Sequence, residues 1–95
     1  MVIPLTKTKI MKLSKPQTNV INLMRKGWEL GFNHSFEGRS WLQKNGLGNG
    51  GQTEDVNANT FQALYDRKLI YVVKESFPSS LYGLTELGKT CTIEL

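Results

Sequence analysis

The chain has 95 residues, 39% of them hydrophobic, and carries a formal net charge of +4. This length predicts a single domain with one modest core, which we place at residues 11–95 behind a tail or edge strand at residues 1–10. The longest apolar run, residues 69–73, is too short to span a membrane, and the N-terminus shows no secretory signal. One cysteine, Cys91, excludes an internal disulfide, so we expect a cytoplasmic protein.

Basic charge is concentrated in the first 26 residues, which contain no acidic side chain. The basic residues of this segment are Lys7, Lys9, Lys12, Lys15, Arg25 and Lys26. Such a segment suits a polyanionic partner, because each Lys or Arg placed on a phosphate releases condensed counterions. The alternative, that these lysines simply keep the protein soluble, stays open.

A first helix is expected from about residue 14 to residue 26. Ser14 and Gln17 have the spacing of a capping box, and Gly27 stands where a helix commonly ends. Residues 28–32 and 39–44 then alternate apolar with polar or small residues, which predicts a β-hairpin.

The hairpin carries both tryptophans of the chain, Trp28 and Trp41. Indole rings can stack on nucleic-acid bases, but a domain of this size needs their apolar area. We therefore predict that both rings belong to the core.

Residues 46–51 read Gly-Leu-Gly-Asn-Gly-Gly, which fits the G-x-G-x-x-G pattern of dinucleotide-binding enzymes. The preceding strand, however, has polar residues where such enzymes have a continuous apolar strand. Glu54 and Asp55 would face the pyrophosphate, and the chain is too short for several βαβ units. We therefore expect a surface loop at residues 45–52, no enzymatic activity and no cofactor.

A second helix is expected over residues 57–68, with Asn57 as its cap and Glu54 and Asp55 as charges favoured by the helix dipole. Helical periodicity directs one set of side chains inward, namely Phe61, Leu64 and Tyr65, and another outward, namely Asn59, Gln62, Ala63 and Asp66. Strands at 69–75 and 81–85 follow, with a turn at 77–80 between them, and a last strand is expected near 91–95.

The segment from the second helix onward resembles the C-terminal half of winged-helix domains, in which a recognition helix leads into a two-stranded wing. The matching residues are Thr60, Leu64, Leu69, Ile70, Tyr82, Leu84, Thr85 and Gly88. The resemblance implies a small α+β, winged-helix-like domain, here with an extra β-hairpin in its N-terminal half. That hairpin stands where the family has a short helix, and Lys68 stands where many members have glycine.

The resemblance and the basic N-terminus together predict a DNA-binding protein, either a small transcriptional regulator or an accessory factor of a phage or mobile element. Helix 57–68 would read the major groove, its amides pairing with adenine and its cations with phosphates. The predicted contact residues are Lys12, Lys15, Asn57, Asn59, Thr60, Gln62, Arg67, Lys68 and Lys74. His34, the only histidine, has no ligand cluster at metal-binding spacing, so no metal site is predicted.

A second hypothesis keeps the winged fold but makes it a non-catalytic protein-interaction module that docks a protein partner through residues 28–52. A homodimer also stays open, since two-fold symmetric DNA sites usually need one, although the sequence shows no dedicated dimerisation helix. Both hypotheses exclude a membrane partner. The DNA hypothesis requires that the amide side of helix 57–68 is open and flanked by cations rather than carboxylates.

Overall fold

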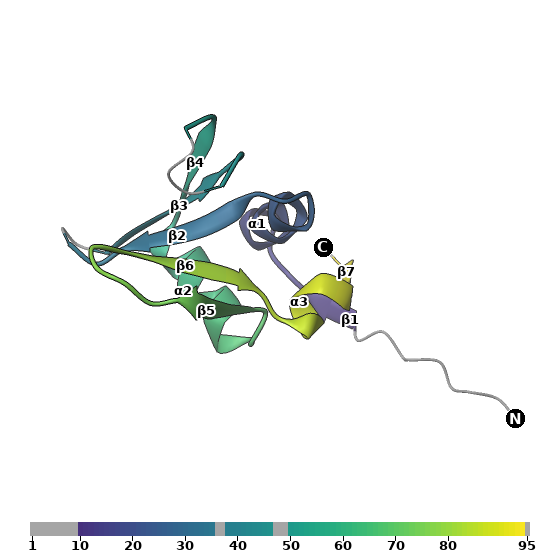
Figure 1. The fold of residues 1–95 in the computed structure, drawn as a ribbon. Helices are drawn as coiled ribbons and strands as arrows, with labels where there is room; N and C mark the ends of the chain where they lie inside the picture. Colours follow the sequence, from purple (N-terminus) through teal and green to yellow (C-terminus); the bar gives the residue numbers. More distant parts are fainter. Residues whose placement is uncertain (1–9, 36–37, 47–49, 95) are drawn as a thin grey trace, which may run out of the picture.

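The computed structural model describes residues 10–35, 38–46 and 50–94. Over these residues the chain is a mixed α+β domain, which confirms the expected class (Figure 1). Its elements are β1 (Ile10–Lys12), α1 (Lys15–Arg25), β2 (Glu29–Asn33), β3 (Arg39–Gln43), β4 (Thr53–Val56), α2 (Ala58–Asp66), β5 (Ile70–Lys74), β6 (Ser79–Leu84), α3 (Glu86–Thr90) and β7 (Thr92–Glu94).

Five strands form one antiparallel sheet in the order β4-β3-β2-β6-β5. Both expected hairpins, β2–β3 and β5–β6, are present, and they join where Leu30 of β2 lies opposite Tyr82 of β6. At the other end of the molecule β1 runs parallel to β7 beside α3 (Figure 1). Of the expected tail or edge strand at residues 1–10, only Ile10 is among the described residues, and it opens β1.

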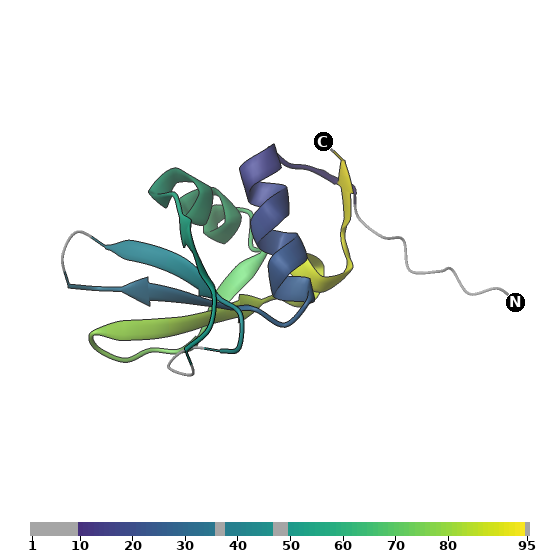
Figure 2. The same ribbon diagram turned by 90° about the horizontal axis from the view of Figure 1, so that it is seen from above.

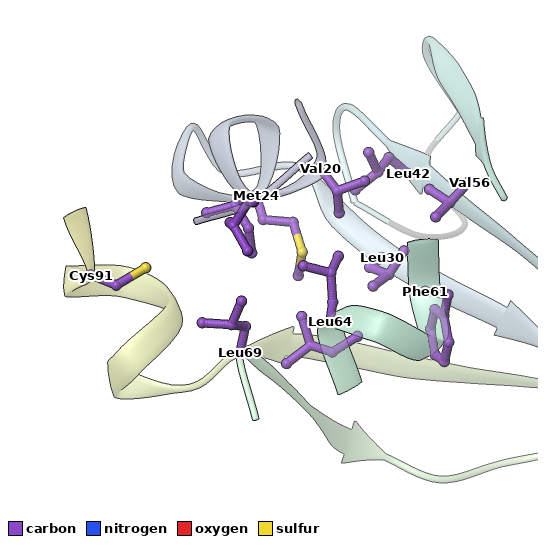
Figure 3. Packing of buried hydrophobic residues seen from close by; sticks show 12 residues of the cluster. Val20, Met24, Leu30, Leu42, Val56, Phe61, Leu64, Leu69 and Cys91 are labelled. Carbon is purple, nitrogen blue, oxygen red and sulfur yellow. The ribbon is translucent and has the colours of Figure 1, made fainter. Parts of the chain in front are cut away.

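Helices α1 and α2 lie over one face of the sheet, as the view from above shows (Figure 2). The core lies between these layers and is built from apolar side chains of both helices and the inward positions of the strands (Figure 3). Trp28 packs against this core, but Trp41 pairs with Gly31 on the opposite face of the sheet. The prediction that both tryptophans belong to the core therefore holds for Trp28 only.

Helix α1 begins and ends as its sequence predicts. The Ser14 hydroxyl accepts a hydrogen bond from the Gln17 backbone N–H, and the Gln17 side chain accepts one from the Ser14 N–H in return. At the other end Gly27 has a φ of 108°. The N–H groups of Gly27 and Trp28 bond to the carbonyls of Met24 and Leu23, which is the Schellman pattern of helix termination.

Helix α2 ends with the same pattern, but a lysine takes the glycine position. Lys68 has a φ of 62°, and its N–H bonds to the Tyr65 carbonyl while the Leu69 N–H bonds to the Leu64 carbonyl. Leu64 and Leu69 are both fully buried, which supplies the apolar contact of this motif. Lys68 thus adopts the left-handed conformation that glycine adopts at little cost.

Glu54 and Asp55 belong to β4 and not to the first turn of α2, so the prediction that they are charges favoured by the helix dipole was wrong. β4 pairs antiparallel with β3, with Trp41 opposite Asp55. The glycine-rich segment therefore connects two antiparallel strands, although residues 47–49 lie outside the described part. A dinucleotide cradle needs a helix directly after its last glycine, and here Gly51 leads into a strand.

A third helix, α3, follows β6 where the sequence predicted only a change of direction. Thr85 caps it, its hydroxyl accepting a hydrogen bond from the Gly88 N–H. Gly88 is buried, and a Cβ there would overlap the carbonyl oxygen of Leu69. This close approach places α3 directly against the connection between α2 and β5.

Candidate nucleic-acid interface

The outward side of α2 is open to solvent in the structure. Asn59, Gln62 and Asp66 are all exposed, as their helical spacing predicted. The Gln62 side-chain amide, however, donates a hydrogen bond of 2.9 Å to a carboxylate oxygen of Asp66. A carboxylate therefore borders this surface and engages one of its two candidate base-reading amides.

Two predicted contact residues have structural roles instead. Thr60 is 8% exposed and lines a narrow recess with Pro16 and Val20 of α1, so its side chain is not available to DNA. The prediction failed there because the sequence does not show on which side α1 packs. Asn57 is exposed, but its side-chain oxygen accepts the Asn59 N–H at 2.7 Å and caps the helix.

Three exposed cations lie at the C-terminal end of α2. The Arg67 guanidinium donates a hydrogen bond of 3.0 Å to the backbone carbonyl of Lys12, which is 55 residues away in sequence, and so brings the end of β1 to the end of α2. The group formed by Lys12, Arg67 and Lys68 is called the basic end of α2 below. Lys15 is also exposed, but it opens α1, and the next residue, Pro16, lines a recess with Asn57 and Thr60 nearer the start of α2.

Lys74 does not belong to this group. It is the last residue of β5, and the whole strand separates it from Lys68. At about 3.3 Å per strand residue, the two side chains start about 20 Å apart along the chain. Lys74 is exposed, but the structure does not bring it to the other predicted cations.

An aromatic groove opens between α2 and strands β2 and β6 of the sheet. It has a volume of about 430 Å³ and is lined by Phe32, Gly38, Ala58, Phe61, Gln62, Tyr65 and Tyr82. The rings of Phe61 and Tyr82 meet edge to face with centroids 4.9 Å apart, and Tyr65 meets Tyr82 at 6.2 Å. Burial raises the pKa of the Tyr82 phenol, and the nearby Tyr65 and Glu75 raise it further.

Sequence reasoning missed this groove because Tyr65 was expected in the core. The ring is 47% exposed, since Tyr65 lies on the flank of α2, beyond the positions that face the sheet. Phe61 and Leu64 are buried as predicted. The outward position of Tyr65 is what leaves one side of the groove open.

Other candidate groups serve the fold. The His34 Nε2 atom lies 2.7 Å from the Ser80 hydroxyl, and Ser80, the last residue of the expected turn at 77–80, is 1% exposed. Cys91 is buried at the edge of the core (Figure 3). Among the described residues, no cluster of three potential metal ligands occurs, and no helix is long and apolar enough to cross a membrane.

Comparison of the chain with protein-family models, curated proteins and solved structures finds no match. The geometry around α2 is therefore the basis for assigning a function.

Proposed function

We propose that this chain is a non-catalytic DNA-binding protein that presents the exposed side of α2 to the major groove of a duplex. The observation that carries the proposal is the hydrogen bond from Arg67 to the Lys12 carbonyl. It joins two distant segments so that Lys12, Arg67 and Lys68 flank one end of an open helix. Carboxylates also border this surface, Asp66 on the helix and Glu94 in register with Lys12, so the requirement for cations rather than carboxylates is met only in part. A small transcriptional regulator, or an accessory factor of a phage or mobile element, would use such a surface.

The cations and the amides have separate tasks in this proposal. Lys12, Lys15 and Lys68 contact phosphates, which fixes the position of the protein on the duplex without reading its sequence. Asn59 reads a base edge, since an Asn amide pairs with N6 and N7 of adenine. Gln62 joins only if DNA displaces its bond to Asp66, so Asn59 is the principal reader.

The proposed scaffold is winged-helix-like. Helix α2 leads directly into the β5–β6 hairpin, which takes the place of the wing. The β2–β3 hairpin stands where a winged-helix domain has a short helix before its recognition helix. The contact surface proposed here therefore consists of α2, its basic end and Lys15.

Fluorescence anisotropy of a labelled duplex, titrated with protein at several salt concentrations, tests this function. The variant Lys12→Gln/Lys15→Gln should lower the slope of log affinity against log salt by about 1.8, because each lost phosphate contact removes about 0.9. Lys44→Gln/Lys89→Gln is the matched control, since it removes the same charge from exposed positions elsewhere. Absence of binding to any duplex at about 50 mM salt, or equal losses in both variants, would contradict the proposal.

A second candidate function is that of a protein-interaction module, and the aromatic groove favours it. Phe32 and Gly38 of the groove belong to residues 28–52, the segment predicted to dock a protein partner. Aromatic-lined grooves bind extended peptides in several interaction domains. Asn59→Ala, at a residue that does not line the groove, should abolish the sequence preference of a DNA reader and spare a docking module, whereas Tyr65→Ala should have the opposite effect.

A further inference from the structure

The two edges of the five-stranded sheet differ in chemistry. β4 forms one edge and carries Glu54 and Asp55, charges of the kind that discourage another strand from pairing. β5 forms the other edge, and all its residues after Ile70 are exposed. Exposure continues beyond the end of β5 through residues 75–78, so a segment longer than the strand itself faces solvent.

Apolar side chains are concentrated on this second edge. Tyr71, Val72, Val73 and Phe77 are 48%, 37%, 50% and 77% exposed, and they are called the β5 patch. Only Ile10 and Tyr65 are comparably exposed among the other large hydrophobic residues that the structure describes. Exposed apolar side chains gathered along one edge of a sheet in this way are typical of interaction sites.

We propose that a second copy of the chain covers the β5 patch. Residues 72–77, the last three of β5 and the three that follow it, would lie antiparallel to the same residues of the second copy about a two-fold axis. The segment reads Val-Val-Lys-Glu-Ser-Phe and is self-complementary in this arrangement. When the axis passes between Lys74 and Glu75, each Lys74 faces Glu75 of the second copy. Each Val72 then faces Phe77 of the second copy.

Charge complementarity favours a second copy over a polyanion or an unrelated strand. Lys74 and Glu75 balance one another, so this edge does not attract phosphate, whereas a two-fold axis forms two ion pairs and two apolar pairs at once. Lys74, predicted as a phosphate contact, would serve this interface instead. The proposal does not depend on DNA binding.

The geometry of β5 limits the assembly to a dimer and does not allow continued addition of strands. The register shifts between Val72 and Lys74, which is a β-bulge, and a bulge discourages continuous pairing along an edge. A contact of six residues also buries less than the roughly 800 Å² per partner of a standard interface. We therefore expect a weak, transient dimer.

Sedimentation equilibrium over a concentration series, without DNA, tests the arrangement through charge exchange. Lys74→Glu and Glu75→Lys each place like charges opposite one another, and each should weaken the dimer about tenfold. The double variant Lys74→Glu/Glu75→Lys restores opposite charges and should dimerise like the wild type. A mixture of the two single variants should form heterodimers, because one variant presents two carboxylates at these positions and the other presents two ammonium groups.

The two single variants change the net charge in opposite directions, so general repulsion would weaken one and strengthen the other. Asp55→Lys, on the β4 edge, is the positional control and should leave the dimer unchanged. Phe77→Ser, at the most exposed apolar residue, should weaken the dimer about tenfold with an unchanged circular dichroism spectrum.

Three results would overturn the proposal. The first is a wild-type protein that stays monomeric at all concentrations, in which case the β5 patch serves another partner. The second is a double variant as weak as either single variant. The third is an equal loss in Asp55→Lys, which indicates head-to-tail contact between the β4 and β5 edges. Because none of these measurements includes DNA, failure of the dimer and failure of DNA binding are distinguished.

Discussion

Replacing Lys68 with glycine should stabilise the protein, although glycine usually destabilises the interior of a helix or strand. Lys68 has a φ of 62°, and a residue with a Cβ loses about 1–2 kcal/mol in this left-handed region. Glycine removes that cost but loses about 0.5–1 kcal/mol more backbone entropy on folding. The difference predicts a gain of about 0.5–1 kcal/mol in the free energy of unfolding.

Gly27 provides a matched control because it occupies the same position of the same motif at the end of α1. Its φ is 108°, and a Cβ placed there would have no atom within 4 Å. The cost of Gly27→Ala is therefore entirely a backbone cost, about 0.5–1 kcal/mol after the backbone entropy that alanine saves is subtracted. Lys68→Gly removes a side chain at this position of the motif, and Gly27→Ala adds one at the equivalent position. The first substitution should therefore raise the free energy of unfolding and the second should lower it.

Urea unfolding followed by tryptophan fluorescence measures both effects, provided that the slope of free energy against urea stays constant. Lys68→Ala separates the effect of the backbone conformation from the effect of the charge, since it keeps the Cβ and removes the cation. It should leave stability nearly unchanged but weaken DNA binding as much as Lys68→Gly does. A Lys68→Gly protein no more stable than the wild type would refute the account of the α2 terminus.

Three further predictions follow from individual contacts. Gly88→Ala should lower the free energy of unfolding, measured in urea, by about 3 kcal/mol. The new Cβ would overlap the Leu69 carbonyl oxygen, which belongs to the backbone and cannot turn away. A loss below about 1 kcal/mol would mean that α3 is free to shift. Ser14→Ala should cost about 1 kcal/mol through the lost capping box, and an unchanged stability would show that α1 begins elsewhere. The raised pKa of Tyr82 favours its protonated form in the folded state, so stability should fall as pH rises above about 10. Tyr82→Phe should show a smaller loss than the wild type when urea unfolding at pH 9 and pH 11 is compared, and equal losses would contradict the assignment.

Local signals predicted the elements whose ends depend on neighbouring residues. The capping box of Ser14 and Gln17 and the position of Gly27 fixed α1 almost to the residue, since each acts within one helical turn. Asn57 marked the start of α2 in the same way. Helical periodicity also placed Asn59 and Gln62 correctly on the exposed side.

Elements that depend on distant partners were missed. β4 contains Glu54 and Asp55, residue types depleted in strands, and it forms because β3 offers it an edge. No pattern in residues 53–56 themselves indicates that β3 offers an edge for pairing. The helix α3 has only five residues, too few for a recognisable period, and it depends on the cap at Thr85.

The candidate site was predictable in its parts and not in its assembly. Arg67 and Lys12 were each expected to contact DNA, but no pattern within the sequence links residues 55 positions apart. Thr60 was misplaced for the same reason, because its burial depends on where α1 crosses α2. Tyr65 differs from a core position by a fraction of a turn, which periodicity over a nine-residue helix does not resolve.

A continuous series of hydrogen bonds holds the end of α2 in place. The Thr85 hydroxyl donates to the Lys68 carbonyl at 2.6 Å and accepts from the Gly88 N–H. The Gly88 carbonyl in turn accepts two hydrogen bonds from the Arg25 guanidinium of α1. The end of α2 is thus fixed to α1 through α3, as well as to β1 through Arg67. These bonds fix the backbone at Lys12 and Lys68, so in the proposed DNA complex the ordering cost would fall mainly on the lysine side chains.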